Sequence, residues 1–491
     1  MCKIKVIMAS FDPKQLAAWT GGSWFNGAPR VVDGISTDSR RIAPGNIFVA
    51  LRGSNFNGHD FVSSAFRQGA SGAVVARSDL MGKDKAFGPL LAVNDTAKAL
   101  QQMAANYRQA LNIRIIAVTG SVGKTTVKEM IAGILTRRLA TAKTIGNWNN
   151  EYGLPLSILN MEPHAEVGVF ELGVNHPGEL FPLCQLLKPD WGVITAIGPA
   201  HLEYFGSEKA VADEKSVLLK NLPENGIAFL GRDHPWFELL NSAARCRVIS
   251  LAELPGRRSG IGGQAMGEHK NADYVLLKSK NGEWEEGEKE VIEKKSGETF
   301  RFHLPLPGRH FALNALFAIA VAREQGFDWS LIREGIETYQ PQPMRWQSET
   351  VGGVLIINDA YNANPMSMAA ALQTFVAQKH DGHKWLVLAG MHELGAVSEE
   401  EHKKLGLFIG GFQWGGLVTV GRLGNTIADW AEKAGMKMKN IFRCENHSSA
   451  AKVLSDFVRP GDAVLFKASR CERLEKALEI WKEIRQVRDA R

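Results

Sequence analysis

Cysteine is scarce in this chain of 491 residues, and the five cysteines lie far apart. No two of them form a CxxC pair, so the sequence provides neither a zinc ribbon nor a disulfide framework and gives no indication of secretion. Long hydrophobic runs are also missing, because no stretch approaches the roughly 20 apolar residues that span a bilayer. The chain reaches Asp12 too early to contain the apolar core of a signal peptide. These absences predict a cytoplasmic protein without membrane insertion.

A strong excess of one charge sign is absent as well. The sequence holds 58 Lys and Arg against 52 Asp and Glu, and the resulting net charge of +6 is spread along the chain. No basic block with interleaved aromatic residues occurs, so we expect no nucleic-acid partner. A mildly basic enzyme that handles anionic substrates accounts for the same charge.

The length predicts about three or four domains, since domains run roughly 100–200 residues. Residues 1–112 alternate short apolar runs with turns, which indicates a small α/β unit. Residues 113–339 repeat a strand, turn and helix rhythm that predicts a mostly parallel sheet buried under helices. The proline-spaced connector 340–343 ends this region, and the alternation over 340–491 predicts a second, Rossmann-like α/β domain. Residues 283–295 are expected to form a charged surface hairpin or loop.

The most informative segment, residues 117–126, reads Ala-Val-Thr-Gly-Ser-Val-Gly-Lys-Thr-Thr. It follows an apolar run and precedes a helical pattern over 127–139. A strand, a glycine loop and a helix start direct backbone N–H groups, the helix dipole and an ammonium at one point, which suits a nucleoside triphosphate with Mg²⁺. The T-G-x-x-G-K-T-T spacing is shorter than the general phosphate-loop pattern. The residues expected to bind the phosphates are Gly120, Ser121, Val122, Gly123, Lys124, Thr125 and Thr126.

Two further candidates follow buried strands. Glu171 ends the apolar run 167–170, and His201 comes just after the next strand candidate, 193–196. Taken alone, Glu171 is equally compatible with a glutamate at the surface, and a single histidine is more often structural than a ligand. The carboxyl ends of parallel strands share one edge of a sheet, however, so we expect Thr125, Glu171 and His201 to converge there.

Three other positions remain ambiguous on pattern alone. Lys215 lies on a helical segment, where a lysine is usually solvated. Asn314 lies one turn into an apolar helix that opens after Gly308, either as a base-reading amide or as an ordinary polar residue. The segment 359–365, Asp-Ala-Tyr-Asn-Ala-Asn-Pro, is equally compatible with a structural turn and a ligand loop.

In this order the motifs resemble the Mur ligase family, the ATP-dependent amide ligases of peptidoglycan precursor synthesis, over nearly the whole chain. The segments that carry the resemblance are 119–126, 147–151, 171–173, 200–203, 308–314 and 359–365. The forms of 171–175 and 359–365 favour a member that joins D-alanyl-D-alanine to UDP-N-acetylmuramoyl-tripeptide. A ligase similar to folylpolyglutamate synthase and, in another class, a P-loop nucleotide-binding regulator remain as alternatives.

The resemblance implies roles for five residues in binding ATP and two Mg²⁺ ions. Lys124 would bind the β- and γ-phosphates and Thr125 one Mg²⁺, while Glu171 and His201 would hold the second. Lys215 matches the position of an N-carbamoylated lysine in the family. A bare ammonium beside Mg²⁺ would be repelled, whereas a carbamate reverses the charge and provides the oxygen ligands that Mg²⁺ prefers.

The resemblance also implies how the three domains, 1–112, 113–339 and 340–491, divide the substrates. The first would bind the UDP-muramoyl group, the second ATP, and the third the dipeptide while it closes on the nucleotide through Arg345 and Asp359. Asn314 would contact adenine. The candidate substrate-binding residues are Ser39, Arg40, Ser54, Asn55, Phe56, Asn150, Asn362, Asn364, Ser469 and Arg470. We expect a monomeric ligase.

Overall fold

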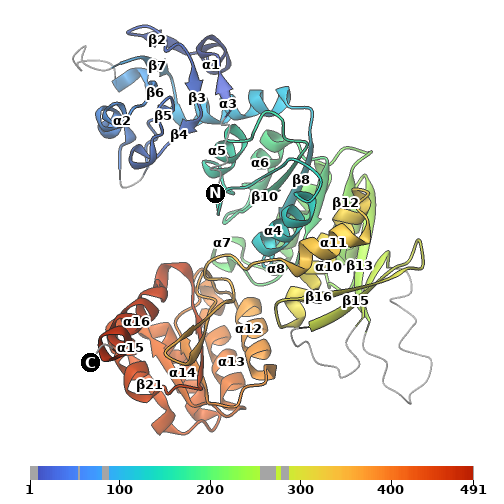
Figure 1. Cartoon of the computed structure of the whole chain (residues 1–491), viewed down its shortest axis with the longest axis vertical. Helices are drawn as coiled ribbons and strands as arrows, with labels where there is room; N and C mark the ends of the chain where they lie inside the picture. The colour runs from blue at the N-terminus through green and yellow to red at the C-terminus, as the bar shows by residue number, and fades with distance from the viewer. Residues whose placement is uncertain (1–8, 54–55, 80–87, 255–271, 278–286, 490–491) are drawn as a thin grey trace.

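Three α/β regions follow one another along the long axis of the computed structural model, with the N-terminal region at one end and the C-terminal region at the other (Figure 1). The structure describes residues 9–53, 56–79, 88–254, 272–277 and 287–489. Within these residues, the strands form a two-stranded sheet and larger sheets of five, nine and six strands.

The N-terminal region contains the five-stranded sheet, in the order β2-β7-β6-β5-β4, in which only β2 is antiparallel to its described neighbour. Asp95 caps the long helix α3 by accepting bonds from Ala97 N (2.8 Å) and Lys98 N (3.0 Å), a role for which Asp is well suited. The elements are β1 Ser10–Phe11, α1 Pro13–Thr20, β2 Ser23–Phe25, β3 Val32–Asp33, β4 Ile35–Ser36, β5 Ile47–Val49, α2 Val62–Arg67, β6 Gly72–Ala76, β7 Leu90–Val93 and α3 Thr96–Ala110.

The central region is built on the nine-stranded sheet, in the order β16-β15-β14-β13-β12-β11-β8-β10-β9. The seven strands from β9 to β14 in this order are parallel, as predicted. These seven strands and the helices among them are β8 Arg114–Thr119, α4 Lys124–Leu135, β9 Thr141–Lys143, α5 Gly153–Leu159, β10 Val167–Glu171, α6 Leu180–Leu187, β11 Trp191–Ile194, α7 Leu202–Phe205, α8 Glu208–Lys220, β12 Ile227–Gly231, α9 Phe237–Ala243, β13 Arg247–Leu254 and β14 Tyr274–Leu277.

An antiparallel extension completes the central sheet. Residues 287–293, expected as part of a charged hairpin or loop, form strand β15 between β14 and β16, and residues 283–286 lie outside the described residues. Lys289, Val291 and Glu293 are buried, so alternate residues of this charged segment face inward. The remaining elements of the region are β15 Gly287–Glu293, β16 Thr299–Leu304, α10 Arg309–Glu324 and α11 Trp329–Glu337.

The C-terminal region holds the six-stranded sheet, in the order β17-β18-β22-β19-β20-β21, in which β17 is antiparallel and the other described strands are parallel. Asn364 and Ser367 form a capping box at the start of α12, and Pro365 occupies its first turn. The elements are β17 Gln347–Val351, β18 Val354–Asn358, α12 Pro365–Ala377, β19 Lys384–Leu388, α13 Ser398–Gly410, β20 Gly416–Val420, α14 Gly421–Lys433, β21 Ile441–Cys444, α15 His447–Phe457, β22 Ala463–Lys467 and α16 Glu475–Asp489.

The two faces of the central sheet belong to different hydrophobic cores. Ile116 and Val118 of β8 pack with α4, α10 and α11, whereas Ile115 and Ala117 pack with α5, α6, α8 and α9. The first core continues into the C-terminal region and the second into the N-terminal region. The alternation along β8 therefore connects all three regions through one strand.

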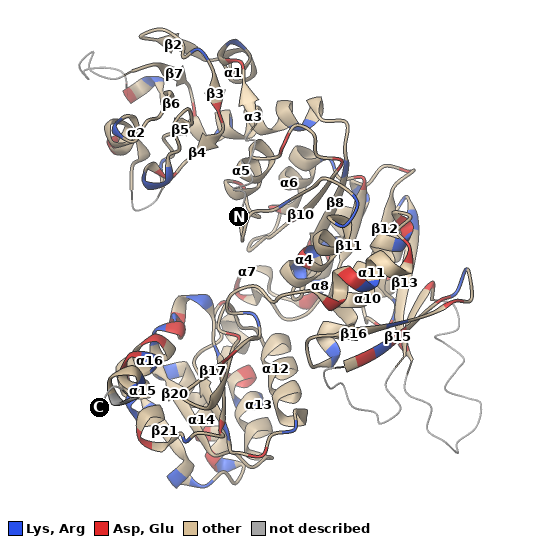
Figure 2. Cartoon of the chain, in the orientation of Figure 1, with Lys and Arg blue, Asp and Glu red and all other residues tan. Residues whose placement is uncertain are grey.

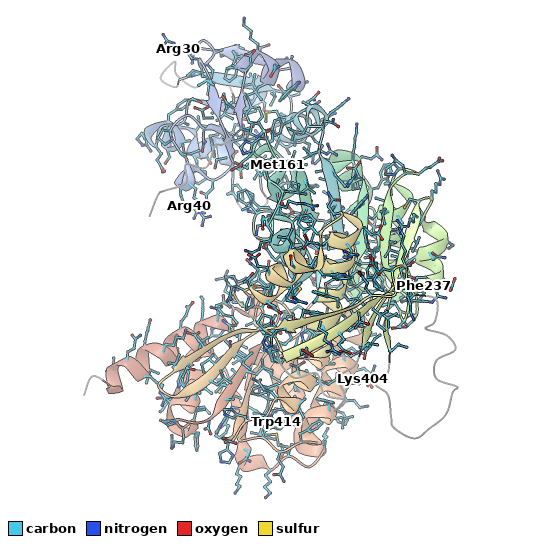
Figure 3. The ribbon with its side chains drawn as sticks, turned by 45° about the vertical axis from the view of Figure 1, so that its right-hand side comes forward. Arg30, Arg40, Met161, Phe237, Lys404 and Trp414 are labelled. Carbon is cyan, nitrogen blue, oxygen red and sulfur yellow. The ribbon has the colours of Figure 1, made fainter. Side chains whose placement is uncertain are left out.

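Polar contacts also join the N-terminal and central regions. Tyr107 of α3 donates its hydroxyl to the carbonyl of Met161 (3.0 Å), which lies where these two regions meet (Figure 3). The Arg108 guanidinium donates to the carbonyls of Leu187 (2.8 Å) and Lys188 (3.1 Å) at the end of α6. These bonds fix α3 against the central sheet.

Positive and negative side chains are interspersed over all three regions (Figure 2). No helix among the described residues combines the length and apolar character that crossing a membrane requires.

Two glycines at the contact between α4 and α11 provide a test of this packing. A Cβ on Gly335 would lie 2.6 Å from the Ile134 Cα, whereas one on Gly133 would have Gly335 O as its nearest neighbour at 3.8 Å. We expect Gly335→Ala to destabilise the chain by about 1–3 kcal/mol because α11 must move away from α4. Gly133→Ala is the matched control, expected to be neutral or stabilising by up to about 1 kcal/mol. Chemical denaturation measures both; equal effects would contradict the close approach.

Candidate active site

The phosphate-loop segment predicted from the sequence lies between β8 and α4. Gly120 (φ 148°) and Gly123 (φ 84°) adopt backbone conformations that side chains disfavour, and a Cβ on Gly120 would lie 2.2 Å from the Thr195 hydroxyl. Helix α4 begins at Lys124 without a side-chain cap. Its first N–H groups are therefore not occupied by a capping side chain, which is the arrangement that anion-binding helix starts use.

The loop is held to the segment that follows β11. Ser121 N donates to Ala196 O (2.7 Å), and the Ser121 hydroxyl bonds both Gly198 N (3.0 Å) and Gly198 O (3.1 Å). Thr195 donates its hydroxyl to Val122 O at 2.5 Å. The end of β11 therefore supports the loop after β8, so that the segment leading to His201 lies against the loop.

Glu171, at the end of β10, is buried rather than solvent-exposed, with 2% of its surface accessible. Its Oε2 accepts a bond from the Thr125 hydroxyl (2.7 Å), and its Oε1 accepts one from the Asn149 amide (2.7 Å). Its backbone N donates to the Thr144 hydroxyl (2.8 Å). The structure thus brings Thr125 and Glu171 together at the sheet edge, as expected.

Lys128 holds the loop that carries Asn149 in place. This lysine of α4 is fully buried and donates to the carbonyls of Thr144 (3.1 Å) and Gly146 (3.3 Å), while it pairs with Glu129 at 2.7 Å. The neighbouring candidate, Asn150, accepts bonds from the backbone at the start of α5. A buried charge with these partners fixes the loop in one position.

Two lysines lie close to the loop, Lys124 half-buried and Lys215 buried. Lys124 donates to Gly120 O (2.7 Å), and burial lowers its pKa, while the charge of Glu171 opposes that change. Lys215 is buried on α8, so the expectation of a solvated helix lysine is wrong. Burial, followed by the charge of Lys124, lowers the pKa of Lys215 to about 7; the charges of Glu214, Glu179 and Glu171 act in the opposite direction. A neutral amine is therefore accessible to Lys215 at neutral pH.

His201 contacts the C-terminal region. Its Nδ1 lies 2.5 Å from the Glu393 Oε2, and the hydrogen bond with His201 is the main cause of a lowered pKa for Glu393. The described residues hold no group of three or more His, Cys, Asp and Glu side chains placed to bind a metal ion. The Thr125 hydroxyl and Glu171 carboxylate are nevertheless oxygen donors of the type that Mg²⁺ prefers.

Two of the expected ATP-binding residues face the phosphate loop from other elements. A Cβ on Gly123 would lie 2.6 Å from the Asn314 Oδ1, so the amide of this α10 residue is directed at the start of α4. Arg345, in the linker after α11, places its guanidinium over the Tyr361 ring at 4.0 Å. The charge of Arg345 is the smallest of the causes that act on the lowered pKa of Lys124, after burial and the opposing charge of Glu171.

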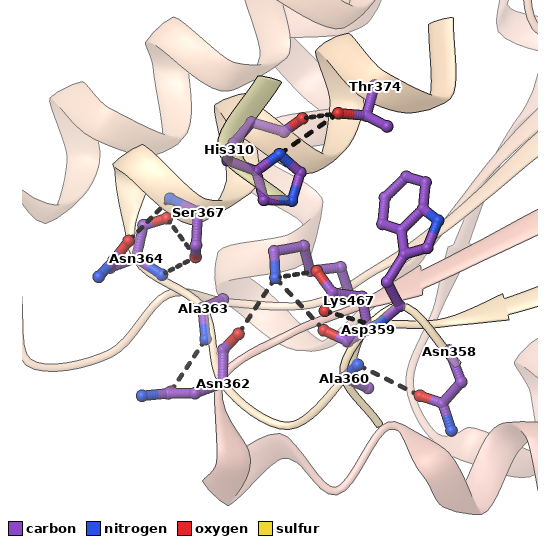
Figure 4. A network of polar contacts seen from close by, with 12 residues as sticks. His310, Asn358, Asp359, Ala360, Asn362, Ala363, Asn364, Ser367, Thr374 and Lys467 are labelled. Atoms are coloured by element: carbon purple, nitrogen blue, oxygen red, sulfur yellow. Dashed lines mark hydrogen bonds and ion pairs between the residues drawn. The ribbon is translucent and has the colours of Figure 1, made fainter. Parts of the chain in front are cut away.

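Asp359 is bound into a network between the linker and the C-terminal sheet (Figure 4). Its Oδ1 accepts from Trp346 N (3.1 Å), and its Oδ2 pairs with the buried Lys467 at 2.5 Å. Lys467 also donates to the carbonyl of Asn362 (3.2 Å). Nearby, burial lowers the pKa of His310 to about 4, so its ring is neutral.

The other candidates of the C-terminal region make local contacts. The Asn364 side chain caps α12 by accepting from Ser367 N (2.8 Å). The Ser469 hydroxyl donates to a carbonyl of the 359–365 loop (3.2 Å), and Arg470 pairs with Glu475 at 2.7 Å. The structure thus brings Asp359, Asn362, Asn364 and Ser469 to one loop cluster.

The N-terminal candidates lie in a separate group. Ser39 is nearly buried, whereas the adjacent Arg40 is exposed and bonds Asp38 through its Nε (2.9 Å), an interaction that lowers the pKa of Asp38. Phe56 is 58% exposed. Among the described residues, no hydrogen bond or ion pair joins this group to the phosphate loop. Two candidates lie outside the described residues: Ser54 and Asn55.

Four residues of the site did not follow from the sequence: Asn149, Lys128, Lys467 and Glu393. Asn149 lies in the motif 147–151, but position alone did not distinguish it from Asn150. Lys128, Lys467 and Glu393 act through contacts that no local sequence pattern indicates.

These features correspond to a known family of ligases. Three models match the chain: "Mur ligase family, catalytic domain" at residues 31–108, "Mur ligase middle domain" at 118–322, and "Mur ligase, glutamate ligase domain" at 344–470. The chain belongs to the Mur ligase family, and it is an ATP-dependent ligase with the α/β architecture in three domains that the sequence predicted.

Among its relatives are UDP-N-acetylmuramoyl-tripeptide–D-alanyl-D-alanine ligases. The Bacillus subtilis protein of this name is 34% identical over 450 residues, which cover 91% of this chain and 93% of the relative. The Escherichia coli protein is 35% identical over 404 residues, which cover 81% and 83%. The crystal structure of MurF from Acinetobacter baumannii superposes with a TM-score of 0.83 at 28% identity and covers 97% of this chain and 100% of that one.

A second solved structure contains a nucleotide. MurF from Thermotoga maritima in complex with ADP has a TM-score of 0.75 at 28% identity, and the match covers 93% of this chain and 98% of that one.

The amide of Asn149 provides a test of the support for Glu171. Asn149→Ala removes the bond to Oε1, so the carboxylate gains freedom to rotate. We expect turnover to fall about 10- to 100-fold, the range found when groups that orient metal ligands are removed. Steady-state phosphate release measures the effect, and an unchanged thermal midpoint shows that the fold is retained. Asn241→Ala, at an exposed position on α9, is the control; wild-type turnover in Asn149→Ala would contradict the role.

Proposed function

We propose that this chain joins D-alanyl-D-alanine to UDP-N-acetylmuramoyl-tripeptide, with cleavage of ATP to ADP and phosphate. The observation that carries the proposal is the Thr125–Glu171 pair at the phosphate loop, in a chain whose relatives of that name match it nearly from end to end. The soluble, nucleotide-linked substrate suits a monomeric enzyme in the cytoplasm.

The reaction has two steps in this proposal. The tripeptide carboxylate attacks the γ-phosphorus of ATP, which forms an acyl phosphate and releases ADP. The dipeptide amine then attacks the acyl carbon, and the tetrahedral intermediate expels inorganic phosphate. The protein contributes mainly position and charge, because phosphoryl transfer leaves little covalent chemistry to side chains. Lys124 and the N–H groups of the loop would stabilise charge on the phosphates, and Gly120, Ser121, Val122, Gly123 and Thr126 would line them.

Two Mg²⁺ ions are part of the proposal. Thr125 would hold one, and Glu171, His201 and an N-carbamoylated Lys215 would hold the other; bound there, the ions would neutralise charge on the phosphates. The buried carboxylate with its neutral hydrogen-bond donors suits a hard cation. The lowered pKa of Lys215 favours carbamoylation because only the neutral amine reacts with CO₂.

The domain boundaries are likewise proposed at residues 1–112, 113–339 and 340–491. The first domain would hold the UDP-muramoyl group through Ser39, Arg40 and Phe56, together with Ser54 and Asn55. Asn314 would bind adenine, and the third domain would approach ATP through Arg345 and Asp359. The residues proposed to line the tripeptide and dipeptide are Asn150, Asn362, Asn364, Ser469 and Arg470. Closure of the domains would keep water from the acyl phosphate.

Substrate dependence tests the reaction. We expect phosphate release only when ATP, UDP-N-acetylmuramoyl-tripeptide and D-alanyl-D-alanine are all present, since the acyl phosphate forms on one substrate and reacts with the other. A coupled phosphate assay with single omissions measures it. ATP turnover that ignores both substrates would instead support a nucleotide-binding regulator. Tripeptides that carry diaminopimelate or lysine, assayed side by side, identify the preferred third residue.

Lys215 provides a separate test. Lys215→Ala should lose most activity because the proposed oxygen ligands are gone, and short carboxylic acids should restore part of it. Lys209→Ala, on the exposed side of the same helix, is the matched control and should keep wild-type activity. NMR spectra after addition of ¹³C-bicarbonate should contain a carbamate signal in the wild type and the control that Lys215→Ala lacks. The same signal in all three proteins would contradict carbamoylation at this position.

A further inference from the structure

The central and C-terminal regions meet at a contact of two hydrogen bonds between segments 192 residues apart. The Glu393 carboxylate bonds His201 Nδ1 at 2.5 Å, and the Glu393 carbonyl accepts from Glu203 N at 3.1 Å. Both His201 (φ 55°) and Glu393 (φ 62°) have left-handed backbones, which are uncommon outside glycine. Such backbones persist where the surrounding structure holds them in place.

Glu393 belongs to a loop, residues 389–395, that the C-terminal region holds rigidly. Met391 N donates to the buried His402 ring (2.9 Å), and His392 N donates to the Ser469 hydroxyl (3.0 Å). At Gly395 the loop comes so close that a Cβ would lie 3.0 Å from the Glu203 Cα. The backbone of Glu393 is therefore held in place beside His201 by the contacts of its loop.

The chemistry of the contact selects one form of the histidine. An ionised carboxylate only accepts hydrogen bonds, so the His201 Nδ1 must carry the proton. In the neutral ring this leaves the lone pair on Nε2, which is the atom that a metal ion would take. Histidines that bind metals commonly donate their other N–H to a carboxylate, which fixes the tautomer and ring orientation and raises the basicity of the ligating nitrogen.

We infer that Glu393 is a positioning residue for the metal site, supplied to His201 by the C-terminal region. The inference rests on the proposed function, because it takes His201 as a ligand of Mg²⁺. It makes the orientation of a metal ligand depend on the C-terminal region: His201 is correctly oriented only when the 389–395 loop is docked on residues 201–203. Loss of docking would weaken the metal site without changing any of its ligands.

A simple contact between domains is the competing explanation. The side chains of His201 and Glu393 are 22% and 41% exposed, and exposed ion pairs contribute little to stability. If docking were the only role, loss of the carboxylate would alter the arrangement of the regions but not the affinity of His201 for a metal.

Metal binding by the full-length chain distinguishes the two explanations. Titration with Mn²⁺ in the presence of a non-hydrolysable ATP analogue, followed by electron paramagnetic resonance, should detect a site that His201→Ala weakens. We expect Glu393→Ala to weaken the same site about 10- to 100-fold. Glu393→Gln should lose less, because its amide oxygen still accepts the Nδ1 proton. In a His201→Ala background, Glu393→Ala should have no further effect. Glu400→Ala, which removes an exposed partner of Lys403 on α13, is the control.

The tautomer of His201 gives a readout without metal or substrate. In ¹⁵N spectra of the metal-free wild type, the His201 ring should be the Nδ1–H form, identified by its absence in His201→Ala. Glu393→Ala should shift it towards the Nε2–H form, which predominates in free imidazole side chains.

Each outcome separates this inference from the proposed function. If Glu393→Ala leaves Mn²⁺ affinity and the ring tautomer unchanged while His201→Ala weakens the site, the inference is wrong and the metal site survives. If His201→Ala also leaves Mn²⁺ affinity unchanged, His201 is not a ligand, and the proposed metal site fails together with the inference.

Discussion

The parallel pairing of β8 between β10 and β11 is the constraint on which the candidate site depends. In this register Glu171 lies opposite Val118, and Ile194 lies opposite Thr119, so three strands end at the same level. The loop after β8, the carboxylate at the end of β10 and the segment after β11 are therefore neighbours before any side-chain contact is made. A side-chain bond reinforces this arrangement, since the Thr119 hydroxyl at the end of β8 donates to Leu172 O just after β10 (2.9 Å). A change in register would separate all of these groups at once.

Burial determines the electrostatics of the candidate site at this edge of the central sheet. Lys124, Lys215 and Glu171 lie in one electrostatic neighbourhood, in which each lysine has a lowered pKa and the carboxylate opposes the change. Two like charges in a poorly solvated site are unfavourable, so the arrangement favours either loss of a proton from a lysine or the arrival of anions. A triphosphate beside Lys124 and a carbamate on Lys215 both meet that requirement. The same physical condition thus suits both the proposed triphosphate and the proposed carbamate.

Local patterns sufficed for the parts of the fold that local energetics decide. The phosphate loop and the mostly parallel character of the central sheet follow from glycine spacing and apolar runs. The burial of Lys215 did not, because the inner face of α8 is chosen by packing on the sheet and not by its own charge pattern. The role of Glu393 could not be predicted from the sequence for a related reason. Its partner, His201, is 192 residues away, and contacts with His402 and Ser469 determine the shape of the loop that carries Glu393. Pairings across domains leave no periodic signal in a sequence.

The network around Asp359 joins the linker after α11 to the C-terminal sheet. Both carboxylate oxygens of Asp359 are engaged, one by Trp346 N and the other by the buried Lys467. Lys467 is buried and Asp359 only partly exposed, and with both of its oxygens bound the carboxylate is a fixed point and not a mobile contact. The fixed point determines the path of the linker, in which Trp346 adopts a left-handed backbone (φ 54°). Arg345, one residue earlier, is thereby held over Tyr361 and within electrostatic reach of Lys124. The carboxylate thus helps to fix the path of the linker that carries Arg345, and the central and C-terminal regions are joined both by this linker and by the contact between His201 and Glu393.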